Sequence, residues 1–137
     1  MSARFEWSGL EALKASLRAL PEELTAEGGH IVEVRANGAT ATIKAGYPRR
    51  SGSLAAGMDV THSRSRFGAR SVVKNSDKDA AVFERGSQAR HTRIGANRGS
   101  MPANHLFTKT MMRERRGMYQ DLRDLLVRKG LVVTGDV

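Results

Sequence analysis

The chain has 137 residues, of which 39% are hydrophobic and only 5% aromatic, and it carries a formal net charge of +9. This length suits a single domain, which we place over residues 1–137, with one modest core of aliphatic side chains. The absence of cysteine excludes disulfide bonds, thiolate metal sites and thiol nucleophiles, and suits a protein made in a reducing cytoplasm.

The N-terminal part of the chain predicts an amphipathic helix. Ser8 followed by Glu11 forms a capping-box pattern. Five leucines then recur at alternating steps of three and four, at Leu10, Leu13, Leu17, Leu20 and Leu24. Pro21 lacks the backbone N–H that a continuing helix needs, so we expect the helix to end, or to kink and restart, at about residue 20.

Residues 25–46 fit two different structures. Asn37-Gly38 lies between two β-compatible stretches, residues 31–34 and 41–43, which is a hairpin signal. The same segment also fits an Ala-rich helix with its larger apolar residues on one side. Local rules leave both structures open, and Tyr47-Pro48 ends the segment in either case.

The next segment predicts a β-hairpin. Two β-compatible stretches, residues 58–61 and 71–74, flank a polar segment that ends in Phe67-Gly68. Asp77 and Asp79 are typical of a turn between strands. A short apolar stretch follows at residues 80–84.

Residues 85–102 predict a long loop, because they are rich in Gly, Ser, Asn and Arg and show little periodicity. The loop contains no acidic residue and four arginines: Arg85, Arg90, Arg93 and Arg98. A long loop inside a compact domain is usually functional or disordered, and this one is a candidate interface.

The clearest predicted element is a C-terminal amphipathic helix with Gly130 as its C-cap. Its apolar stripe consists of Phe107, Met111, Met118, Leu122, Leu125 and Leu126. Methionines such as Met111 and Met112 suit either core filling or an adaptable partner surface. Residues 131–134 could add a short strand.

The pattern excludes most catalytic chemistry. No histidine stands in a recognisable catalytic spacing, and no Gly-x-Ser-x-Gly motif occurs. Residues 46–52 contain glycines but lack the Gly-Lys-Ser/Thr ending of a phosphate-binding loop. We therefore expect no enzymatic activity, no catalytic residues, no metal site and no cofactor. No apolar run approaches the roughly 20 residues that cross a bilayer, and no signal pattern is present, so we expect a soluble protein without a membrane partner.

Charge is distributed unevenly along the chain. Residues 1–30 have a net charge of −2, and the remainder has a net charge of +11. Opposite patches can steer head-to-tail contact between identical subunits, although a solvated surface explains such charges equally well. In an interface of this kind the candidate residues are Glu11, Glu22, Glu23, Glu84, Arg85, Arg90, Arg93 and Arg98.

Three blocks of sequence together resemble one family. They are residues 47–54 (Tyr-Pro-Arg-Arg-Ser-Gly-Ser-Leu), residues 83–90 (Phe-Glu-Arg-Gly-Ser-Gln-Ala-Arg), and residues 98–103 (Arg-Gly-Ser-Met-Pro-Ala) leading to Leu106-Phe107. In this order, and followed by a charged helix, they resemble the neck or tail-completion family of long-tailed bacteriophages, including lambdoid capsid-type phages. The sequence departs from that family in having Ser51 and Ser87 where threonine is common, and in its longer arginine loop.

The resemblance implies an α+β fold with an N-terminal helical segment, a small antiparallel β-sheet, a long loop and a C-terminal amphipathic helix. It also favours the helix for residues 25–46. The implied function is that of a structural virion protein at the head–tail junction, made in the host cytoplasm. We expect a ring of six identical subunits that joins tail to head and contacts other neck and tail proteins.

In that ring we expect the acidic first helix of one subunit to face the arginine loop of the next. Two alternatives remain open. One is another ring of the same junction, either the tail terminator or the head-closure ring. The other is a nonspecific nucleic-acid-binding protein, since DNA passing through the ring could also contact the basic surface.

Overall fold

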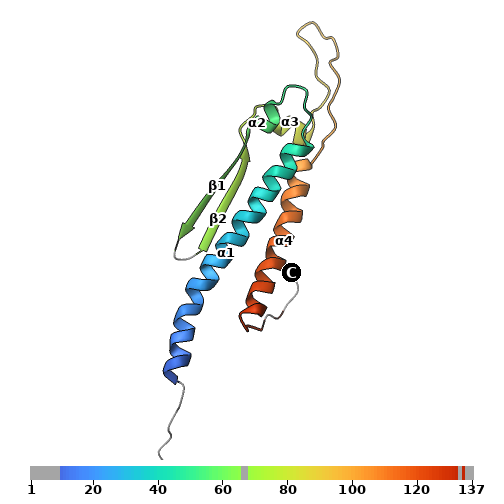
Figure 1. The fold of residues 1–137 in the computed structure, drawn as a ribbon. Coiled ribbons are helices and arrows are strands. Elements are labelled where there is room, and N and C mark those ends of the chain that lie inside the picture. The colour runs from blue at the N-terminus through green and yellow to red at the C-terminus, as the bar shows by residue number, and fades with distance from the viewer. Residues whose placement is uncertain (1–9, 66–67, 133, 135–137) are drawn as a thin grey trace, which may run out of the picture.

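A computed structural model describes residues 10–65, 68–132 and 134 of the chain, with side chains described from residue 21 onward. The elements follow in the order α1 (Leu10–Gly46), α2 (Ser53–Ala56), β1 (Met58–Ser65), β2 (Gly68–Asn75), α3 (Ala80–Arg85) and α4 (Leu106–Arg128). Figure 1 shows that α1 runs along the length of the molecule, with the β1–β2 hairpin along one side and α4 along the other. The predicted α+β fold is confirmed.

Helix α1 has 37 residues and runs through Pro21, so of the two outcomes predicted at about residue 20, an end or a kink, the end of the helix is wrong. Proline removes one intrahelical hydrogen bond, but it does not prevent the chain on either side from staying helical. Thr25 lies one turn later and donates its hydroxyl to the Pro21 carbonyl at 2.7 Å. Ser8, the predicted helix cap, lies outside the described residues.

Residues 25–46 are helical, and the hairpin alternative is wrong. Asn37-Gly38 lies inside α1 and forms no turn. The reason is visible in the burial pattern, because Ala36, Ala39 and Ile43 recur at steps of three and four and are all buried. Packing on this face outweighs the local turn preference of Asn-Gly.

The predicted hairpin is confirmed, and its strands are longer than the sequence indicated. Strands β1 and β2 pair antiparallel from Met58 opposite Asn75 to Ser65 opposite Gly68. Two side chains fix the far part of the hairpin to α1. His62 Nε2 lies 3.1 Å from Asn37 Oδ1, and Arg64 Nε donates to Glu33 Oε1 at 2.8 Å.

Helix α4 packs along α1 through its predicted apolar stripe, with Leu125 almost fully buried. An ion-pair cluster joins the two helices. Arg35 of α1 donates from Nε to Asp121 Oδ2 at 2.7 Å and from Nη1 to Glu114 Oε2 at 3.2 Å. Gly117 makes room for this guanidinium, because a Cβ there would lie 2.6 Å from Arg35 Nη1.

Gly130 ends α4 as predicted. It has φ of 83°, and its N–H donates to the Val127 carbonyl, while the N–H of Leu131 donates to the Leu126 carbonyl. This pair of bonds is a Schellman motif, which favours glycine at the left-handed position. The predicted strand over residues 131–134 is wrong for residues 131, 132 and 134, which lie outside any strand, and residue 133 lies outside the described residues.

A cluster of buried side chains lies at the end of α1, near the start of the arginine loop. Ile43, Tyr47, Met58 and Phe83 are its buried members. The rings of Tyr47 and Phe83 meet edge to face with centroids 5.4 Å apart. The Tyr47 hydroxyl accepts a hydrogen bond from Asn75 Nδ2 at 3.1 Å, which joins α1 to the end of the hairpin.

We predict that Ile43→Ala destabilises the protein by about 2–5 kcal/mol, because it opens a cavity at a fully buried position. Urea denaturation followed by far-UV circular dichroism measures the change. Val34→Ala on the same helix is the matched control. Val34 is 51% exposed, so a change within about 0.5 kcal/mol is expected there. Equal losses at the two positions would contradict this placement of the core.

Candidate interaction surfaces

The predicted long loop, residues 85–102, begins with the last residue of α3, and residues 86–102 fold back on themselves as an arm, which we call the arginine arm. Its two legs are joined by backbone hydrogen bonds: Ser87 N–H donates to the Met101 carbonyl at 2.8 Å, and Arg90 N–H to the Gly99 carbonyl at 3.0 Å. The arm projects beyond the end of the body at which α3 and α4 meet (Figure 1). It is irregular, as predicted, but it has a defined internal register.

The tip of the arm is open to solvent, whereas its base is closely packed. At the tip, Thr92 N–H donates to the Ala96 carbonyl at 2.8 Å, and Ile94 between them is 91% exposed. At the base, Gly86 has φ of 78°, and a Cβ there would lie 2.6 Å from the Met101 carbonyl oxygen. Glycine is therefore needed where the arm leaves the body.

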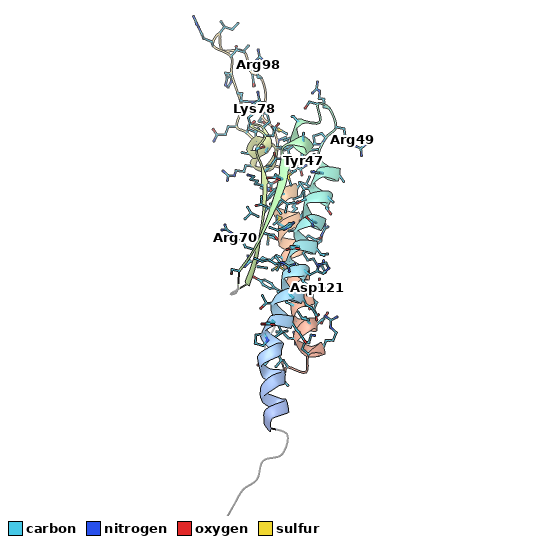
Figure 2. The ribbon with its side chains drawn as sticks, turned by 60° about the vertical axis from the view of Figure 1, so that its left-hand side comes forward. Tyr47, Arg49, Arg70, Lys78, Arg98 and Asp121 are labelled. Atoms are coloured by element: carbon cyan, nitrogen blue, oxygen red, sulfur yellow. The ribbon has the colours of Figure 1, made fainter. Side chains whose placement is uncertain are left out.

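Arg85 at the end of α3 and the arm arginines Arg90, Arg93 and Arg98 are all exposed, and none of them forms an ion pair with another described residue. The same end of the molecule also bears Arg49 and Lys78 (Figure 2). Like the arm arginines, these two side chains are exposed and have no ion-pair partner within the described part of the chain. One end of the subunit is thus strongly cationic.

Glu84 has a function inside the subunit that the sequence did not indicate. Its Oε2 accepts the Phe107 N–H at 2.9 Å, and its Oε1 accepts the Thr108 N–H at 2.8 Å. The start of α4 has no side-chain cap of its own. Glu84 of α3 therefore caps α4 from a separate helix and also complements the dipole of α4.

The electrostatics of Glu84 agree with this capping role. Burial alone would raise the pKa of Glu84, but the hydrogen bonds from Thr108 and Phe107 outweigh burial, so the pKa lies below its ordinary value. Both carboxylate oxygens are engaged within the subunit. The sequence grouped Glu84 with the exposed arginines as a candidate interface residue, but its carboxylate is bound within the subunit.

The other acidic candidates, those of α1, lie at the opposite end of the subunit. Glu23 Oε2 lies 3.0 Å from Lys129 Nζ, and Glu27 Oε1 lies 2.9 Å from the same atom. The hydrogen bond from Lys129 lowers the pKa of Glu27. Glu22 is exposed, and Glu11 lies in α1 with its side chain outside the described set. Within one subunit the structure does not bring these α1 candidates near the arm.

A groove runs between α4 and β2, with α1 beneath it, and has a volume of about 450 Å³. Its apolar lining consists of Val32, Ala36, Ala39, Val73, Phe107, Met111, Met112 and Met118. Arg35, Glu114 and Arg115 are its charged lining residues. Met111 packs against the core, which confirms core filling for this residue, whereas Met112 is 54% exposed and its use as a partner surface stays a prediction.

Comparison with known protein families, curated proteins and solved structures found no match to this chain. Among the described residues, no three histidine or acidic side chains gather into a metal-binding group. No described helix combines the length and apolarity needed to cross a bilayer. The arginine arm, the acidic half of α1 and the groove are therefore the features from which a function can be argued.

We predict that Glu84→Gln destabilises the protein by about 1 kcal/mol at neutral pH, because the helix loses a charged cap. Since folding lowers the pKa of Glu84, its stabilisation is present above the unfolded pKa of about 4.3 and is lost as pH falls through the folded pKa. The stability gap between variant and wild type should therefore close in acid. Urea titrations between pH 7 and pH 3 measure it, with exposed Glu22→Gln as control. A gap that stays constant over this range would refute the capping role.

Proposed function

We propose that this protein is a structural virion protein of a long-tailed bacteriophage, a ring-forming subunit that joins tail to head at the junction between them. It acts by assembly and not by catalysis. Its location is the neck or tail of the virion, after synthesis in the host cytoplasm. The tail terminator and the head-closure ring are the alternative positions at the same junction.

The observation that most supports this proposal is the convergence of the three resemblance blocks in space. Tyr47 and Leu54 come from the first block, Phe83 from the second, and Met101 with Phe107 from the third. All five side chains pack in the same core cluster beneath the arginine arm. The three blocks that carry the resemblance thus form the packed core at the base of the arm.

The shape of the subunit supports head-to-tail assembly. Its cationic arm and the acidic half of α1 lie at opposite ends of a helix that is about 55 Å long. Contact between two unlike surfaces is heterologous, and it generates a ring when the rotation closes. A ring of six subunits matches the sixfold symmetry of a phage tail, and its other partners are further neck and tail proteins.

In this proposal the arm has the joining role. Its arginines are exposed and its tip presents Ile94, so it combines long-range attraction with an apolar contact. Charge complementarity sets the orientation of such an interface, while apolar burial supplies most of its affinity. Glu23 contributes less than its sequence position indicates, because Lys129 of the same subunit already neutralises it.

We predict that virions assembled with Arg90, Arg93 and Arg98 all changed to Glu accumulate as separate heads and tails. Electron microscopy and plaque counts of the phage that encodes the protein measure the outcome. The matched control changes the same three residues to Lys, which keeps the charge, and should give joined particles. Joined, infectious particles from the Glu variant would eliminate the arm as the joining surface. Absence of the protein from purified virions would eliminate the function itself.

A second candidate function is nonspecific binding of nucleic acid, which the cationic end of the subunit favours. Unpaired cations gathered on one surface neutralise phosphates. No helix-turn-helix pattern or aromatic stacking platform accompanies them in the sequence, so the contact would carry little sequence information. Duplex DNA passing through the ring is the polyanion that such a surface would meet.

We predict that duplex DNA binds with a Kd no tighter than about 10⁻⁶–10⁻⁴ M at near-physiological salt, the range of nonspecific contacts. Fluorescence anisotropy with labelled duplexes of two unrelated sequences tests this. The affinity should fall steeply with salt, and the triple Arg→Glu variant should bind still more weakly. Submicromolar, sequence-selective binding would overturn the structural proposal in favour of a DNA-binding protein.

A further inference from the structure

The two legs of the arginine arm are paired antiparallel, in the same register at both of the arm's bridges. Two pairs of opposite residues define this register: Ser87 with Met101, and His91 with Asn97. It places Arg90 opposite Arg98, and the Arg98 N–H donates to the Arg90 carbonyl at 2.6 Å. Opposite residues of an antiparallel pair have Cβ atoms about 4.5–5.5 Å apart. The two guanidinium groups therefore start from adjacent points on the arm and can reach the same ligand.

This arginine pair is electrostatically unfavourable in the isolated subunit. Like charges opposite each other destabilise a two-stranded pair. Arg90 and Arg98 are both exposed, and neither forms an ion pair with another described residue. Residues 86–102 contain no acidic side chain that would relieve the repulsion. A bound anion would neutralise both guanidinium groups, so the pair indicates an anion-binding site.

The arginine pair lies within a larger cationic surface. Arg93 lies at the tip of the same arm, and Arg49 and Lys78 lie at the same end of the subunit as Arg98 (Figure 2). One small anion would neutralise only the pair, whereas a linear polyanion also reaches the other cations. The surface therefore suits a polymer of anionic groups.

A second copy of the chain cannot supply these anions. The described carboxylates that already pair with Lys or Arg of their own subunit are Glu23, Glu27, Glu33, Asp59, Glu114 and Asp121. Both oxygens of Glu84 cap α4. Each copy also has a net charge of +9, so identical copies cannot neutralise one another in any arrangement. The compensating polyanion must come from outside the homo-oligomer.

The shape and composition of the arm favour duplex DNA among such polymers. The arm is a narrow ribbon of two legs, and the major groove of B-DNA admits a two-stranded ribbon. Residues 86–102 contain no Phe, Tyr or Trp, so the arm lacks the stacking platform typical of proteins that bind single strands. Arginine also matches phosphate oxygens with two parallel N–H donors.

We propose that Arg90 and Arg98 together hold phosphate groups of duplex DNA. This deepens the second candidate function, on which it rests, by naming its site. The two arginines lie in the legs of the arm. The tip residues Arg93 and Ile94 remain available for contact with protein.

The salt dependence of DNA binding tests this site. Fluorescence anisotropy with a labelled duplex between about 50 and 200 mM salt compares wild type with the double variant Arg90→Gln/Arg98→Gln. Each neutralised phosphate contributes about 0.9 to the slope of log Kobs against log salt concentration. We expect the variant to lower the magnitude of this slope by about 1–2, the loss of one or two phosphate contacts. An unchanged slope would overturn the inference.

A matched control separates the arginine pair from net charge. Arg70→Gln/Arg116→Gln also removes two exposed arginines, but Arg70 lies on the hairpin away from the arm (Figure 2) and Arg116 lies on α4. We expect this control to keep the wild-type slope, and Arg90→Lys/Arg98→Lys to keep it as well. Circular dichroism checks that each variant is folded. If Arg70→Gln/Arg116→Gln lowers the slope as much as the arm variant does, charge acts diffusely and the inference is wrong.

A poly-glutamate peptide distinguishes phosphates from the carboxylates of an acidic protein. Its charges are about 3.5 Å apart when extended, whereas duplex DNA carries one charge per about 1.7 Å, so we expect it to bind more weakly. Tighter binding that is lost in Arg90→Gln/Arg98→Gln would assign the pair to an acidic protein surface and contradict the inference. Because purified protein is used, failure of this site leaves the virion role standing. Conversely, absence of the protein from virions would not alter the DNA result.

Discussion

The fold depends on helix α1, which packs against the β1–β2 hairpin on one face and against α4 on another. The β1–β2 hairpin has only two strands, and an isolated two-stranded hairpin is at best marginally stable in water. The hairpin persists because Ile43 of α1 and Tyr47, the residue after α1, pack with Met58 and its neighbours, while α4 covers another side of the same helix. Arg35 fixes α4 through Asp121 and Glu114, and this hydrogen bonding raises the pKa of Arg35.

This arrangement holds the arginine arm and the acidic residues of α1 at opposite ends of the subunit. The arm is held at one end because Glu84 of α3 caps α4 and Tyr47 packs on Phe83, which joins the elements on either side of the arm to α1. The acidic residues are held at the other end by their pairing with Lys129. One continuous helix thus connects two ends of unlike charge.

The elements that the sequence predicted well are those in which local pattern and packing agree. The hairpin and α4 belong to this group, and so does Gly130, whose left-handed conformation is a backbone requirement. Helix α1 was ambiguous because Pro21 and Asn37-Gly38 favour other structures locally. Burial of Ala36, Ala39 and Ile43 outweighs the turn preference of Asn37-Gly38. The cap by Glu84 and the groove arise between elements distant in sequence, so no spacing rule indicates them.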